Sequence, residues 1–235
     1  MKSSIIRPFT FQLYTGCMFA GKTRAMLTDI SRINEHNIQK KSPSFKINYL
    51  CFKPDVEKKD GPFIVSRGYG GQNVMRESAI IIPAQSPDII VDIYEKESRT
   101  KNIDAIFLNE IQFLPKDICG IIDYLKHKGV AVSADGLLFD YTHSLFGTMG
   151  DVLEHATNIY TFTATCSIDD CIIPATHTQR IIKETGLPAP LGELVVFDSK
   201  NSSNNSNKKN ENPFGYQPRC FKDFVHPSTV SDSYK

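Results

Sequence analysis

The chain has 235 residues, 40% of them hydrophobic and 23% charged, which fits one globular domain with a small addition and excludes a disordered or collagen-like protein. Its 27 basic and 26 acidic residues give a net charge of +1, which argues against a protein that coats nucleic acid or an anionic membrane. There is no apolar run of roughly 18 residues and no signal peptide, and the six cysteines indicate thiols or metal ligands, so we expect a reducing, cytoplasmic compartment.

The first part of the chain alternates predicted strands with predicted helices. Hydrophobic patterning predicts strands at 9–15, 45–52, 103–110 and 130–135. One helix is predicted at 116–129, and another has a predicted apolar face made of Met26, Leu27, Ile30, Ile33 and Ile38. This alternation predicts an α/β fold in which a parallel sheet is covered by helices on both faces. We assign it to a first domain at residues 1–157.

The character of the sequence changes after about residue 157. Residues 159–166 and 193–197 are predicted strands of a smaller, β-rich unit at 158–235, which holds three of the six cysteines. Residues 199–212 contain ten Ser or Asn and no apolar side chain. Such a segment cannot bury enough surface to order itself, so we predict a flexible insertion there.

The segment GCMFAGKT at 16–23 fits the phosphate-loop pattern G-x-x-x-x-G-K-[ST]. In this pattern backbone amides surround phosphate oxygens, Lys22 reaches the β- and γ-phosphates, and the Thr23 hydroxyl ligates Mg²⁺. A plain glycine turn is the alternative, but the predicted strand before the segment and the helix after it are the context that the motif requires. The residues predicted to bind phosphate are Gly16, Cys17, Met18, Phe19, Ala20, Gly21, Lys22 and Thr23.

A carboxylate follows the predicted strand at 103–110, which ends in Asn109-Glu110. Phosphoryl transfer to an alcohol uses a carboxylate beside the acceptor hydroxyl. The carboxyl ends of parallel strands meet beside the phosphate loop, so Glu110 is a candidate base. The alternative is an ordinary solvated loop residue.

These motifs together resemble the type II thymidine kinases. GCMFAGKT is similar to that family's G-P-M-F-S-G-K-[ST], and NEIQF (109–113) to its D-E-x-Q-F. GLLFDYTHSLF (136–146) is similar to G-L-D-x-D-F-x-x-x-P-F, and KPDVEKK (53–59) to K-P-x-x-D-x-R. The resemblance extends over residues 9 to about 226. It implies a phosphate-loop α/β domain followed by a zinc-binding lasso domain, and assembly as a homotetramer or homodimer.

The resemblance also implies an activity and a role for each matching residue. The activity is Mg²⁺-dependent transfer of the ATP γ-phosphate to the 5′-hydroxyl of thymidine and of deoxyuridine, with Glu110 as the base. Residues implied on the phosphate side are Glu57, Lys59, Asn109 and Gln112. Residues implied around the nucleoside are Met18, Phe113, Leu137, Tyr141, Phe146, Leu194, Val196 and Tyr216. Plain core packing is the alternative for the aromatic ones.

The cysteines of the smaller unit form a candidate zinc site. Cys166 and Cys171 have the spacing of structural zinc ligands, and the resemblance implies Cys220 as the third ligand. The fourth is His226 or Asp223, with His226 preferred because a softer nitrogen ligand suits thiolates. Ordinary thiols are the alternative. The remaining histidines, among them His143 and His177, are predicted to be solvated or capping.

Two other functions remain open at this point. Asn109 stands where the family has Asp, and in a non-catalytic nucleotide-binding relative this neutral amide would mark lost chemistry. Mg²⁺ is bound largely by substrate phosphates and waters, so the alternative is that activity survives. A phosphate-loop ATPase that binds nucleic acid through a zinc-bound tail is the third hypothesis. The near-neutral charge argues against it, so we expect no nucleic-acid partner and no membrane partner.

Overall fold

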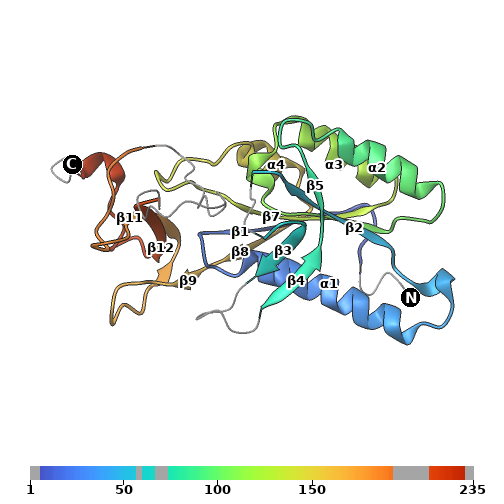
Figure 1. Ribbon diagram of the computed structural model, residues 1–235, viewed down its shortest axis with the longest axis horizontal. Helices are drawn as coiled ribbons and strands as arrows, with labels where there is room; N and C mark the ends of the chain where they lie inside the picture. Colours follow the sequence, from blue (N-terminus) through green and yellow to red (C-terminus); the bar gives the residue numbers. More distant parts are fainter. Residues whose placement is uncertain (1–5, 57–59, 67–73, 193–211, 231–235) are drawn as a thin grey trace, which may run out of the picture.

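A six-stranded parallel sheet forms the centre of the computed structural model, which describes residues 6–56, 60–66, 74–192 and 212–230 (Figure 1). Neighbouring strands follow the order β5-β2-β6-β7-β1-β8, and every neighbouring pair is parallel. The strands are β1 (Phe11–Gly16), β2 (Tyr49–Pro54), β5 (Ile80–Ile82), β6 (Ala105–Leu108), β7 (Ala131–Leu137) and β8 (Asn158–Phe162).

Helices cover both faces of this sheet, as predicted. They are α1 (Lys22–Gln39), α2 (Ile89–Ser98), α3 (Asp117–His127) and α4 (Met149–His155). Helix α1 lies below the sheet in Figure 1 and the other three lie above it. Each face has its own apolar core, and α1 contributes Met26, Leu27, Ile30 and Ile33 to one of them. Ile38, also predicted on that apolar face, is 85% exposed because it lies in the last turn of the helix, beyond the core contacts.

Several elements depart from the sequence prediction. Strand β2 begins at Tyr49 rather than at residue 45, because Pro43–Phe45 form a 3₁₀ turn. Helices α2 and α4 were not predicted. Neither was the antiparallel hairpin of β3 (Phe63–Ser66) and β4 (Met75–Ser78). None of the helices in the described ranges combines the length and apolar character that a membrane span requires.

The last strand of the main sheet lies beyond the predicted domain boundary at residue 157. Residues 159–166 are predicted as part of the smaller unit, but β8 pairs with β1 at the edge of the main sheet. Tyr160 of β8 stacks on Tyr14 of β1, with ring centroids 5.3 Å apart. The sheet therefore continues to Phe162.

The smaller unit consists of two antiparallel pairs at the carboxyl ends of the sheet strands (Figure 1). One pair is β9 (Ala164–Thr165) with β10 (Pro174–Ala175), and the other is β11 (His177–Ile182) with β12 (Phe214–Arg219). The predicted strand at 193–197 and all but the last residue of the predicted insertion at 199–212 lie outside the described residues.

The smaller unit contacts the phosphate loop directly. The Met18 amide donates to Thr178 Oγ1 of β11 at 3.0 Å, and the Cys17 thiol donates to the Ala175 carbonyl at 3.4 Å. Residues from both parts of the chain therefore surround the edge of the sheet where the loop lies.

Candidate active site

The phosphate loop connects β1 directly to α1. Gly16 has φ +146°, and a Cβ there would lie 2.2 Å from the Phe162 carbonyl oxygen, so no larger residue fits. Gly21 has φ +89° and precedes Lys22, where α1 begins. These two glycines turn the backbone so that the loop caps the amino end of α1, which favours an anion at this position.

Lys22 is buried beneath the loop. Its Nζ donates to the Cys17 carbonyl oxygen at 2.7 Å, so the side chain spans the loop from within. Burial lowers the pKa of Lys22, and the nearby carboxylates of Glu110 and Asp135 oppose that shift. The ammonium group is thus placed between the loop and two acids.

The buried carboxylate of Asp135, near the carboxyl end of β7, joins three parts of the site. Its Oδ2 accepts a hydrogen bond from Thr23 Oγ1 of the phosphate loop. Its Oδ1 accepts from Asn109 Nδ2 at 2.8 Å and from the Glu110 amide at 3.0 Å. Burial raises the pKa of Asp135 above its usual range, and these hydrogen bonds and the charge of Lys22 oppose that rise without cancelling it.

Asp135 is missing from the residues predicted from the sequence. The signal was available, because Asp135 ends the predicted strand at 130–135, just as Glu110 ends its own predicted strand. Both carboxylates lie at carboxyl ends of neighbouring parallel strands, which is where α/β proteins place their sites.

Glu110 is held in position by Gln112. Glu110 has φ +52°, which is uncommon for a residue with a side chain and frequent at functional sites. Gln112 Nε2 donates to Glu110 Oε2 at 2.5 Å, and Gln112 Oε1 accepts from the Leu137 amide at 3.1 Å. The carboxylate of the candidate base is therefore tied to the end of β7.

The residues predicted around the nucleoside fall into separate groups. Phe113 and Phe146 form an edge-to-face pair with centroids 5.4 Å apart, close in sequence to Gln112 and Leu137. Tyr141 is only 2% exposed; its hydroxyl donates to the Gly192 carbonyl at 2.7 Å and accepts from the Gly192 amide at 3.0 Å. Tyr141 therefore anchors the backbone at residue 192.

The other predicted residues are distributed as follows. Met18 lies in the loop with its amide bonded to β11, and Tyr216 is paired with Arg180 across β11 and β12. Four residues lie outside the described part of the chain: Glu57, Lys59, Leu194 and Val196.

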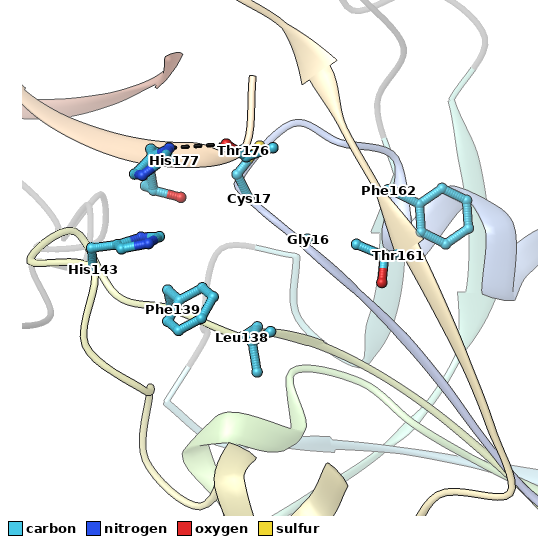
Figure 2. A pocket seen from close by; sticks show the side chains of 10 residues that line it. Gly16, Cys17, Leu138, Phe139, His143, Thr161, Phe162, Thr176 and His177 are labelled. Atoms are coloured by element: carbon cyan, nitrogen blue, oxygen red, sulfur yellow. Dashed lines mark hydrogen bonds between the residues drawn. The ribbon is translucent and has the colours of Figure 1, made fainter. Parts of the chain in front are cut away.

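A cavity of about 330 Å³ opens beside the start of the phosphate loop (Figure 2). The residues that line it are Gly16, Cys17, Leu138, Phe139, His143, Thr161, Phe162, Thr176, His177 and Thr178. Its size is in the range of small-molecule sites. Among the described residues, none of those predicted around the nucleoside lines this cavity.

Two histidines form one wall of the cavity and were expected to be solvated or capping. The rings of His143 and His177 stack with centroids 4.1 Å apart, and Figure 2 shows them facing each other. Phe139 packs against His143, and Phe224 stacks on His177. The pKa of His177 is lowered, mainly by burial and to a smaller extent by the neighbouring charge of His143. The sequence spacing gave no indication of this contact because the two histidines come from different parts of the chain.

Three cysteines and an aspartate of the smaller unit could hold a metal ion. The thiols of Cys166, Cys171 and Cys220 and a carboxylate oxygen of Asp223 lie within 4.8 Å of one another. Cys220 Sγ is 3.0 Å from Asp223 Oδ2, and hydrogen bonds from the thiols, that of Cys220 first, lower the pKa of Asp223. Three sulfurs and one oxygen are an acceptable set for four-coordinate Zn²⁺.

His226, which the sequence favoured as the fourth ligand, lies outside this cluster. Its Nδ1 is 2.6 Å from Ser228 Oγ, and its Nε2 is 3.2 Å from the Thr142 carbonyl. Asp223 takes the fourth place because it lies in the turn that starts at Cys220, where the Asp223 amide bonds the Cys220 carbonyl.

Comparison with known proteins gives consistent matches. The thymidine kinase family model matches residues 9–189. A thymidine kinase of Mycoplasma capricolum subsp. capricolum is 29% identical over 220 residues, which cover 92% of this chain and 88% of the relative. That of Thermococcus kodakarensis is 28% identical, covering 79% and 85%, and that of the Onion yellows phytoplasma is 32% identical, covering 79% and 78%.

Replacing Gly147 should destabilise the segment that carries Glu110. Gly147 has φ +54°, and a Cβ there would lie 2.2 Å from the Gln112 carbonyl oxygen. We expect Gly147→Ala to lower the free energy of unfolding by about 1–3 kcal/mol, measured by urea denaturation. Gly150→Ala, inside α4, is the control, because its Cβ meets only the end of the Leu145 side chain at 3.3 Å. Equal stability of the two variants would contradict this account of Gly147.

Proposed function

The chain belongs to the thymidine kinase family, and we propose that it transfers the γ-phosphate of ATP to the 5′-hydroxyl of thymidine and of deoxyuridine, with Mg²⁺. The observation that carries this proposal is the connection, through one shared carboxylate, between the phosphate loop and the candidate base. Thr23 of the loop and the amide of Glu110 bind the same carboxylate, that of Asp135. The loop that would bind the phosphate donor and the candidate base for the acceptor hydroxyl are thereby held at one edge of the sheet.

The residues of the loop bind and neutralise the donor phosphates. In a phosphoryl transfer little covalent chemistry falls to the protein, so catalysis comes from positioning and from charge stabilisation. Lys22, whose Nζ bonds the Cys17 carbonyl, has its ammonium already beneath the loop and turns to the β- and γ-phosphates. Thr23 and the phosphates would hold Mg²⁺, which would supply positive charge to neutralise the charge that develops in transfer.

Glu110 accepts the proton of the acceptor hydroxyl. Its carboxylate is half-buried and fixed by Gln112, so it is oriented before substrate arrives. Phe113, Leu137 and Phe146 lie around this part of the chain and supply apolar surface for a base. These assignments rest on the resemblance and on the hydrogen bonds around Glu110.

A degenerate binder and a nucleic-acid ATPase are not favoured. The hypothesis of a non-catalytic relative depends on the missing carboxylate at Asn109. The Asp135 carboxylate nevertheless lies beside it, with Oδ1 at 2.8 Å from Asn109 Nδ2. The similarity to thymidine kinases covers most of the chain. In line with the family resemblance, we propose a homodimer or homotetramer in the cytoplasm, without a nucleic-acid partner.

A panel of nucleosides tests the proposed reaction. Purified protein with ATP and Mg²⁺ is incubated with thymidine, deoxyuridine, deoxycytidine and deoxyguanosine in turn, and chromatography measures the monophosphates. We expect product from thymidine and deoxyuridine alone. Absence of product from all four, together with clear ATP binding, would instead favour the non-catalytic relative.

The Glu110→Gln variant tests the base. Without a proton acceptor we expect kcat to fall by about 10²- to 10⁴-fold while the affinity for ATP is retained. Glu97→Gln is the control, because Glu97 lies near the end of α2 and pairs with Lys101 on the surface. If Glu110→Gln turned over as fast as this control, Glu110 would lose its assigned role.

We further propose that the cluster of Cys166, Cys171, Cys220 and Asp223 binds structural zinc. Elemental analysis of the purified protein should find about one zinc per chain. Asp223→Ala should lower the zinc content and the melting temperature, whereas His226→Ala should change neither substantially. The opposite pattern would restore His226 as the ligand, and zinc-free wild-type protein would exclude the site.

A further inference from the structure

We propose that Asp135 supplies the carboxylate charge for Mg²⁺ that Asn109, a neutral amide, cannot supply. This inference rests on the proposed function, because it concerns the metal that accompanies ATP. Asn109 follows β6, Asp135 lies near the carboxyl end of the neighbouring strand β7, and the two side chains are joined by a hydrogen bond of 2.8 Å.

The first argument is the contact with Thr23. In phosphate-loop enzymes Mg²⁺ is held by the Ser or Thr of the loop and by an aspartate at a neighbouring strand end. Here Thr23 Oγ1 donates its proton to Asp135 Oδ2, which leaves the lone pairs of the hydroxyl for an ion. Both groups present hard oxygen atoms, the ligands that Mg²⁺ takes.

The second argument is the position of the strands. The sheet order places β7 between β6 and β1, so Asp135 is on the immediate neighbour of the strand that leads into the phosphate loop. Asn109 follows β6, one strand further away. Asp135 therefore lies on the strand nearer to the loop and to the metal that it binds.

The third argument is the pairing of charge and amide. Oδ1 of Asp135 is held by Asn109 Nδ2 and by the Glu110 amide, two donors that stabilise an ionised carboxylate and orient Oδ2 toward Thr23. A second carboxylate at position 109 would lie 2.8 Å from the first and would disfavour ionisation of both. Asn109 thus serves as a hydrogen-bond donor to the Asp135 carboxylate, which carries the charge in its place.

A purely structural role for Asp135 is the competing explanation, so the test must separate metal binding from folding. The variants are Asp135→Asn, Asn109→Asp, and the double exchange that places the carboxylate on β6 and the amide on β7. Asp104→Asn is the matched control, because Asp104 lies before the amino end of β6 and accepts from the Asn48 amide at 2.9 Å. Unfolding is followed for all of them by circular dichroism.

The readout is binding of Mn²⁺ with ADP, followed by electron paramagnetic resonance, and binding of ADP alone in EDTA. We expect Asp135→Asn to weaken Mn²⁺ affinity by about 10- to 100-fold and to leave ADP affinity in EDTA unchanged within about twofold. The double exchange should recover at least part of the Mn²⁺ affinity, as coupled neighbours do. Asp104→Asn should behave as wild type.

Two results would overturn the proposal. One is a folded Asp135→Asn variant with wild-type Mn²⁺ affinity, and the other is an equal loss of ADP affinity with and without metal. If Asp135→Asn does not fold, the test uses the double variant, Asp135→Asn with Asn109→Asp. A folded double variant whose ADP affinity does not respond to Mn²⁺ would also refute the inference. The readout needs no thymidine, so its failure is distinguishable from a failure of the proposed kinase activity.

Discussion

The hydrogen bonds on the Asp135 carboxylate are the constraint on which the rest of the site depends. They connect β7 to Thr23 at the start of α1 and to Asn109 and the Glu110 amide after β6. The order of the strands brings these segments close together, and the hydrogen bonds fix their positions. A buried carboxylate without such partners would be costly, so the arrangement stabilises the fold only while all the donors are in place. Glu110, whose amide is one of these donors, has a positive φ, and its side chain accepts a hydrogen bond from Gln112.

The smaller unit has a structural connection to the same loop. Cys17 packs in one small cluster with Cys166, Ala175 and Cys220, so the phosphate loop and the cysteine site share a core. Burial raises the pKa of the Cys17 thiol, which keeps it neutral and suited to packing. The position of the loop thus depends on the smaller unit as well as on the sheet.

Local patterns were sufficient for some features and insufficient for others. The phosphate loop and Glu110 could be predicted because each is encoded within a few residues next to a strand end. Asp135 also ends a predicted strand, but the matched pattern begins one residue later, at Gly136, and only the structure shows the hydrogen bonds that join it to Thr23 and Asn109. The choice of Asp223 over His226 follows from the geometry of one turn, and the facing of His143 and His177 from long-range packing. Hydrophobic periodicity likewise could not show that Ile38, in the last turn of α1, is exposed.

The central position of β1 has a consequence for synthesis of the chain. Although β1 comes first in sequence, Phe11 pairs with Val132, and its amide donates to Thr157 Oγ1. Gly16 lies against the carbonyl of Phe162. Domains fold during translation only when their partner segments have emerged, and such distant pairings are slow to form. The phosphate loop is therefore made before the segments that it contacts, and it can take its final position only after residue 162 has been made.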